Sequence, residues 1–243
     1  MIKYPLIIIL SISLLFCFSA CSQCNQTTVY SNNAYHNYLV SESTFELSTE
    51  MYGLESGKLL LTISNARKIY NSQDIPANGG FVQPLHLWQV KNNEYIDYHD
   101  DKVFGANGSF LKNAYMVLVD VTVESHAAIA VTDPYEGMVN DDPYLYADPY
   151  IFDCSMIRLT DLGGNVYQGL FPTVPVTYYS RKDMCQEHPR YYRLEPGETI
   201  SFTLGFLVGG YREDGSLIDP SDLAIGTTMG ETNAAYVLLG LEG

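Results

Sequence analysis

The sequence has few basic residues, and it lacks the short motifs that mark several common enzyme classes. Only 13 Lys and Arg stand against 28 Asp and Glu among its 243 residues, so the formal net charge is −15. A surface of this sign repels phosphate backbones, which excludes nucleic-acid binding through a general basic patch. No G-x-S-x-G, H-E-x-x-H, P-loop or G-x-G-x-x-G motif occurs. We therefore predict no nucleic-acid partner and no enzyme of these classes.

Helical periodicity is also missing. Outside the first 20 residues, no window of a dozen residues keeps an apolar period of 3.6, whereas several segments alternate apolar and polar residues and are separated by turn residues. The predicted strands include Leu59–Ser64, Val117–Glu124, Ile151–Leu159, Val166–Leu170, Val174–Tyr179, Ile200–Val208 and Ala235–Leu241. Seven or more short strands with turns between them predict an all-β chain, folded as an antiparallel sandwich.

The first 20 residues have the composition of an export signal. Lys3 precedes an apolar run from Leu6 to Phe18, and this run is too short to be a flanked membrane span. Phe18-Ser19-Ala20-Cys21 resembles the bacterial lipobox, in which the cysteine is lipidated and becomes the first mature residue. The alternative is an ordinary signal peptide cleaved nearby. We predict lipidation of Cys21, and hence a location on the extracytoplasmic face of the cell membrane.

The next segment, residues 22–44, is polar and almost uncharged. Glu42 is its only Asp, Glu, Lys or Arg. A polar stretch without apolar periodicity behaves as a flexible tether. The predicted organisation is therefore a lipoprotein signal peptide at 1–20, a lipidated cysteine with a flexible tether at 21–44, and a single β-sandwich domain at 45–243.

Several of the strand patterns resemble one family in their order along the chain. They are Lys58–Ala66, Tyr115–Glu124, the turn from Leu159 to Tyr167, and Leu194-Glu195-Pro196-Gly197-Glu198 leading into Thr199–Val208. Together they resemble the immunoglobulin-like (telokin-like) domains of unknown function found in surface lipoproteins of Firmicutes. The resemblance covers roughly residues 55–241. It implies an immunoglobulin-like sandwich with long insertions at 71–113 and 125–150, and it supplies no catalytic residues.

The segment from Asp133 to Asp153 is rich in carboxylates and tyrosines, and it contains neither Lys nor Arg. Clustered oxygens are the ligands of Ca²⁺, whereas tyrosines beside carboxylates suit a sugar or a protein partner. The third alternative is a solvated acidic loop. The candidate ligand or metal residues are Asp133, Tyr135, Glu136, Asp141, Asp142, Tyr144, Asp148 and Tyr150.

A basic counterpart follows, in which arginines and tyrosines interleave. Its candidate interface residues are Tyr179, Arg181, Arg190, Tyr191 and Arg193. Arginine beside tyrosine is typical of interfaces, because the planar cation stacks on rings and pairs with carboxylates. One hypothesis is that this segment docks on the acidic segment, within one molecule or between two. The alternative is a mixed-charge surface hairpin.

Two cysteines, Cys154 and Cys185, lie in the predicted domain. Outside the cytoplasm they are candidate disulfide partners. The competing interpretation is a buried thiol, because alternation places Phe152, Cys154 and Met156 on one face.

These observations favour a cell-surface lipoprotein that is a non-catalytic binding or adhesion module for a protein partner, including a second copy of itself. One alternative is a carbohydrate- or calcium-binding module centred on residues 133–153. The other is a carboxylate-dependent hydrolase, since a glycosidase needs only two carboxylates placed in space. Apart from Ca²⁺ in the first alternative, no cofactor is predicted.

Overall fold

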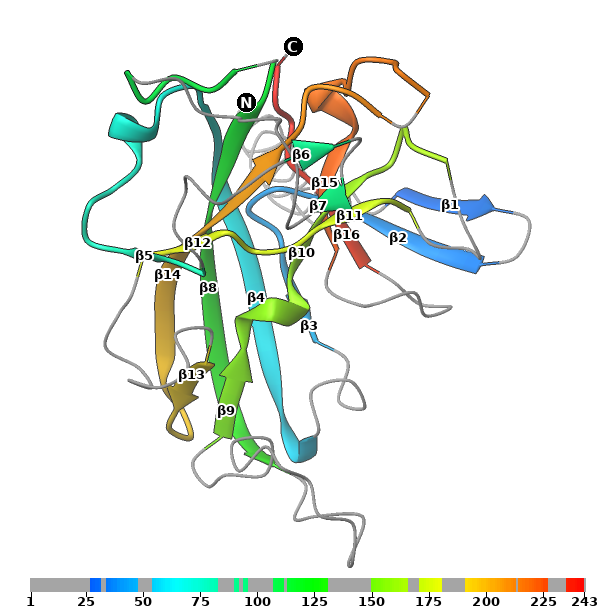
Figure 1. Cartoon of the computed structure of the whole chain (residues 1–243). Helices are drawn as coiled ribbons and strands as arrows, with labels where there is room; N and C mark the ends of the chain where they lie inside the picture. Colours follow the sequence, from blue (N-terminus) through cyan, green and yellow to red (C-terminus); the bar gives the residue numbers. More distant parts are fainter. Residues whose placement is uncertain are drawn as a thin grey trace, which may run out of the picture.

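The computed structural model describes most of the chain from residue 27 onward (Figure 1). The described residues are 27–31, 34–47, 54–82, 90–91, 94–95, 107–111, 113–130, 150–165, 171–180, 191–212, 214–226 and 235–242. Within these ranges the regular structure consists of β-strands and short 3-10 turns. The prediction of an all-β chain is therefore confirmed.

The longest strands form a six-stranded sheet in the order β3–β4–β8–β14–β12–β5. Its members are β3 (Thr44–Glu46), β4 (Leu54–Ile69), β5 (Gly80–Phe81), β8 (Tyr115–Ala130), β12 (Tyr178–Tyr179) and β14 (Thr199–Val208). Every neighbouring pair in this sheet is antiparallel. We call it the long sheet.

A second six-stranded sheet, the short sheet, has the order β1–β2–β16–β15–β10–β11. Its members are β1 (Thr27–Ser31), β2 (Ala34–Val40), β10 (Arg158–Asp161), β11 (Thr173–Val174), β15 (Leu223–Gly226) and β16 (Ala235–Leu238). Its strands pair antiparallel except for β16 and β2, which are parallel.

Two small ribbons and three 3-10 turns complete the described structure. The ribbons pair β9 (Tyr150–Asp153) with β13 (Tyr191–Leu194), and β6 (Val90–Lys91) with β7 (Glu94–Tyr95). The turns are η1 (Ser72–Asp74), η3 (Cys154–Met156) and η4 (Pro220–Asp222).

One hydrophobic core joins the two sheets. Val117, Val119, Val121 and Val123 of β8 are fully buried, as the alternation predicts. They share a core cluster with short-sheet residues such as Ile225. Side chains that alternate inward from both sheets therefore fill the space between two layers.

A smaller core covers part of the outer face of the long sheet. Met116 and Leu118 are also fully buried there, in a cluster with Ile75 and with Tyr178 of β12. The Tyr178 hydroxyl donates to the carbonyl of Pro76 at 2.8 Å, which fixes this covering segment. The described part of the predicted insertion at 71–113 is thus packed against the sheet.

The prediction of a flexible tether at 21–44 is wrong from residue 27 onward. Strands β1 and β2 lie within it, and Leu39 is buried in the core. The start of the domain at residue 45 is therefore placed too late. The reason is that β2 pairs with β16, near the other end of the chain, and no local pattern reveals such a partner.

The predicted insertion at 125–150 also begins too early, because residues 125–130 continue β8. They pair with the start of β4 through register shifts between Leu54 and Lys58. Residues 131–149 lie outside the described residues, as do residues 166–170, for which a strand is predicted.

Two predicted strands are interrupted. Ile151–Leu159 is broken by η3, whose first turn is capped by the Asp153 carboxylate accepting from the Ser155 amide at 2.8 Å. Val174–Tyr179 divides into β11 of the short sheet and β12 of the long sheet. Pro175 lies between them and has no amide hydrogen, so a continuous strand is disfavoured there.

Candidate interaction site

Most of the sequence-predicted site residues lie outside the described part of the chain. These are Cys21, Asp133, Tyr135, Glu136, Asp141, Asp142, Tyr144, Asp148, Arg181, Cys185 and Arg190. Lipidation, calcium or glycan binding by the acidic segment, and a disulfide between Cys154 and Cys185 therefore stay predictions. Cys154 itself is fully buried, directly after β9.

The ends of the acidic and basic segments meet in one ribbon. Tyr150 pairs with Leu194, and Asp153 pairs with Tyr191, in the antiparallel β9–β13 ribbon. Arg193 lies in the same ribbon, opposite Ile151. The two segments are therefore neighbours at this point, whereas the docking of their remaining residues stays a prediction.

Tyr179 does not belong to an exposed surface. It is buried in the main core, and its strand β12 lies between β14 and β5. Its hydroxyl donates to the Phe81 carbonyl at 3.5 Å. The prediction of Tyr179 as an interface residue is wrong, because alternation in so short a strand does not show which side faces the core.

Four exposed apolar side chains gather at one end of the molecule, a feature that the sequence analysis missed. They are Tyr70 (57% exposed), Leu111 (38%), Tyr211 (42%) and Leu217 (59%), and we call them the apolar patch. The Phe110 amide donates to the Tyr70 carbonyl at 3.1 Å, and Asn113 Nδ2 donates to the Tyr211 hydroxyl at 2.8 Å. These bonds join the residue after β4, residues 110 and 113, and the loop after β14.

Residues 211–212 and 214–217 belong to a tight hairpin that carries half of this patch. Tyr211 and Leu217 face each other in an antiparallel bridge, and the Arg212 amide donates to the Ser216 carbonyl at 2.8 Å. Gly215 has φ +82°, a conformation that favours glycine, and adding a Cβ there would meet nothing within 4 Å. Asp214 completes the turn by accepting from the amide and hydroxyl of Ser216.

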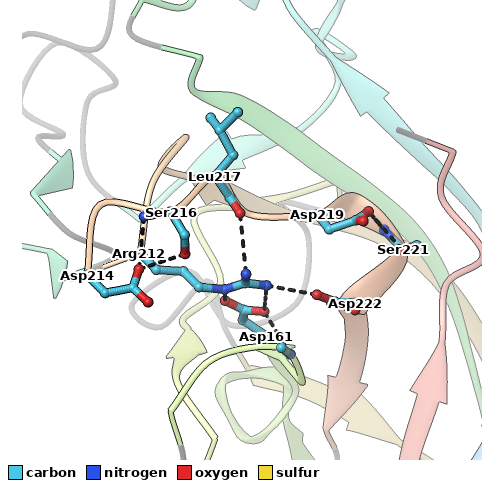
Figure 2. Close-up of polar contacts among 9 residues, drawn as sticks. Asp161, Arg212, Asp214, Ser216, Leu217, Asp219, Ser221 and Asp222 are labelled. Carbon is cyan, nitrogen blue, oxygen red and sulfur yellow. Dashed lines mark hydrogen bonds and ion pairs between the residues drawn. The ribbon is translucent and has the colours of Figure 1, made fainter.

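An ion-pair cluster fixes the base of the hairpin (Figure 2). Arg212 Nε lies 2.7 Å from one oxygen of Asp161, and Nη2 lies 2.8 Å from the other. Nη2 also lies 2.8 Å from Asp222, and Nη1 donates to the Leu217 carbonyl at 3.3 Å. We call Arg212, Asp161 and Asp222 the ionic lock.

Two members of the lock are largely removed from water, because the Arg212 side chain is 16% exposed and Asp161 is buried, whereas the Asp222 side chain is 39% exposed. Asp161 is only 4% exposed, and it receives a two-point contact from the guanidinium. The hydrogen bonds from Arg212 to Asp161 raise the pKa of the guanidinium further, so Arg212 stays charged. Two-point pairing of this kind holds geometry as well as charge. The lock therefore ties the hairpin to the end of β10 and to η4.

Tyr115 lies beneath this end of the molecule. It is 5% exposed, and its ring centroid lies 6.0 Å from that of Tyr70. Burial, with smaller contributions from nearby Tyr70, Asp161 and Asp219, raises the pKa of its phenol, so the hydroxyl stays protonated. Within the described residues this hydroxyl has no hydrogen-bond partner.

Two exposed carboxylates flank Tyr211 and Leu217. Hydrogen bonds from the hydroxyl and amide of Ser216 lower the pKa of Asp214, and those from Ser221 lower the pKa of Asp219. Both groups are therefore anionic at neutral pH. At the other side of the patch, Lys68 Nζ lies 5.8 Å from the Tyr70 ring centroid and donates to the Glu242 carbonyl.

Two findings on the described residues concern metal binding and membrane spans. Among them, no group of three or more His, Cys, Asp or Glu side chains is arranged to hold a metal ion. Over the same residues, no helix is both long enough and apolar enough to cross a membrane.

Comparisons with known proteins identify neither a family nor a function for this chain. No protein-family model and no curated protein matches the chain. A solved structure, that of the yjhA protein from Bacillus subtilis, is similar at 10% sequence identity and a TM-score of 0.37. The alignment covers 83% of this chain and 99% of that one. Similarity at this level supports no assignment of function.

Proposed function

We propose that the protein is a lipid-anchored, extracytoplasmic binding module with an immunoglobulin-like sandwich, and that it binds a protein partner through the end that carries the apolar patch. The role is non-catalytic. The observation that carries the proposal is the gathering of Tyr70, Leu111, Tyr211 and Leu217 at one end. Exposed apolar residues scattered singly need no explanation, whereas a group of them is typical of interaction sites.

The ionic lock supports a binding role because it holds part of the patch in place. Arg212 joins the hairpin to Asp161 and Asp222, so Tyr211 and Leu217 stand on a fixed base. A surface that is already ordered loses less conformational entropy when a partner binds.

The anchor and the fold are supported by different observations. The lipobox-like Phe18-Ser19-Ala20-Cys21 supports the anchor, and the two layers around one core support a sandwich. Because β1 begins at Thr27, only residues 22–26 separate it from Cys21. This length of chain reaches at most about 20 Å. The proposal therefore places the domain close to the membrane surface.

Site-specific crosslinking in the full-length protein tests the proposal. A photoreactive amino acid replaces Leu217 in the patch or, as a control, Val82, which is 55% exposed and lies outside the patch. The proposal predicts a discrete covalent adduct with another protein at position 217 and none at position 82 in the organism that produces the protein. The same adducts at both positions, or none at 217, would contradict it.

A further inference from the structure

We infer that the partner presents a basic, aliphatic peptide segment, which lies on Tyr211 and Leu217 with its cations beside Asp214 and Asp219. This inference rests on the proposed function and names the class of partner. It comes from one juxtaposition: the hairpin that exposes two patch residues also carries or adjoins two exposed carboxylates.

Asp214 and Asp219 are both negatively charged, and neither forms an ion pair with a described residue. Asp214 and Asp219 accept hydrogen bonds from Ser216 and Ser221, which are neutral groups. Of the two neighbouring cations, Arg212 is held by Asp161 and Asp222, whereas Lys68 lies near the Tyr70 ring and donates to the Glu242 carbonyl. The two aspartates therefore present negative charge to solvent beside an apolar surface.

The two tyrosines of the patch differ in whether a cation of the chain already lies near the ring. The ring of Tyr70 already has Lys68 near its face. Tyr211 is 42% exposed, and Asn113 donates to its hydroxyl, which fixes the ring. A lysine or arginine side chain can lay its aliphatic stem on Tyr211 and extend its charge to Asp214.

The charge of the whole chain favours the same class of partner. The formal net charge of −15 repels an acidic protein and attracts a basic one. Complementary charge raises association rates and selects against partners of the wrong sign. A neutral glycan, although it too could contact tyrosine and carboxylate groups, would gain nothing from this field.

The test titrates the full chain with a short synthetic peptide of alternating lysine and leucine, and with the same peptide carrying glutamine at each lysine position. We expect saturable binding of the lysine peptide alone. Asp214→Asn combined with Asp219→Asn should weaken it about tenfold. Asparagine keeps an oxygen that can accept from the serines, so the turns are preserved.

Matched variants distinguish binding at the proposed peptide site from nonspecific electrostatic attraction to the acidic chain. Glu46→Gln combined with Glu124→Gln changes the net charge equally, on the exposed face of the long sheet, and should leave affinity unchanged. Leu217→Ser should weaken binding about tenfold, whereas Val82→Ser should not. An unchanged melting temperature shows that each variant is folded.

Three results would overturn the inference. Equal weakening by the Glu46 and Glu124 substitutions would show nonspecific charge attraction, and equal binding of the glutamine peptide would exclude recognition of cations. Binding of a chitin oligosaccharide that is lost in Leu217→Ser, without peptide binding, would show a glycan site. If crosslinking at position 217 still yields a protein adduct when the lysine peptide does not bind, the proposed function stands and this inference alone fails.

Discussion

Arg212 shows how one side chain can fix a loop that is distant from its partner in sequence. It bonds to Asp161 at the end of β10, to Asp222 in η4 and to the Leu217 carbonyl within its own hairpin. Asp161 is buried, so its charge depends on this cation for compensation. Removing one partner of a buried pair leaves an uncompensated charge, which costs far more than losing an exposed pair.

The first prediction compares the ionic lock with an exposed ion pair. Arg212→Met should lower the free energy of unfolding by about 3–5 kcal/mol. Arg67→Met, which breaks the half-exposed pair with Asp120, should cost about 0–1 kcal/mol. Urea denaturation of both variants measures the difference, and equal losses would show that the buried lock has no special role.

Asp120 provides a prediction on pH. Its partial burial tends to raise the pKa of its carboxyl, but hydrogen bonds from Asn65 and Thr203 and the charge of Arg67 outweigh this, so the pKa is lowered. A lowered pKa means that the ionised carboxyl stabilises the fold above the unfolded value of about 4, and that this contribution is lost as pH falls through the folded pKa.

The measurement is the difference in unfolding free energy between the wild type and Asp120→Asn, taken at a series of pH values. We expect this difference to be constant near neutral pH and to shrink as pH falls below about 4. A difference that stays constant down to acid unfolding would show that the contacts of Asp120 do not depend on its charge.

At the scale of elements, the two longest strands, β4 and β8, pair through several irregularities. Their register shifts near Gly57, which has φ +75° and lies close to Ala127. A Cβ on Gly57 would come within 2.1 Å of the Ala127 carbonyl oxygen. At Gly197, which has φ +82°, a Cβ would meet nothing within 4 Å.

Alanine substitutions at these two glycines distinguish the free-energy cost of backbone strain from that of a steric clash. Gly197→Ala should cost about 1–2 kcal/mol through its left-handed conformation alone. Gly57→Ala should cost about 1–3 kcal/mol more, because the added methyl group forces two strands apart. Thermal or urea unfolding of the two variants checks this, and a smaller loss for Gly57→Ala would contradict the described strand contact.

The sequence predicted the elements whose information is local. Alternation at Val117–Glu124 and Ile200–Val208 identified β8 and β14, and it correctly placed the four valines in the core. The run Tyr115-Met116-Val117-Leu118-Val119 breaks this alternation. Such a run is typical of a strand buried on both faces, so the small outer core could have been anticipated.

The strand pairings and side-chain contacts that could not be predicted join residues that are distant in the sequence. The pairing of β2 with β16 and the bonds from Arg212 to Asp161 join segments far apart in the chain. The turns at Asp214-Gly215-Ser216 and Asp219-Pro220-Ser221 are readable from sequence, because short polar side chains followed by serine cap turns. That Tyr211 and Leu217 remain exposed beside them is not readable, since exposure is decided by the packing of the whole fold.

At the scale of the whole molecule, the proposed function joins a proposed anchor at Cys21 to a proposed docking end formed by the apolar patch. The anchor predicts that Cys21→Ala abolishes incorporation of a labelled fatty acid, because the acylated thiol is lost. Cys24→Ala should keep the label, as the matched cysteine control. Mass spectrometry of the mature N-terminus checks both variants, and an unmodified Cys21 in the wild type would contradict the anchor.

Docking of a peptide on the apolar patch is tested by hydrogen–deuterium exchange of the full chain with and without the lysine–leucine peptide. We expect the peptide to slow exchange at residues 68–70, 107–114 and 209–219, which include the patch and its flanking aspartates. Protection confined to the exposed face of β4, β8 and β14, with no change in the 209–219 hairpin, would contradict it.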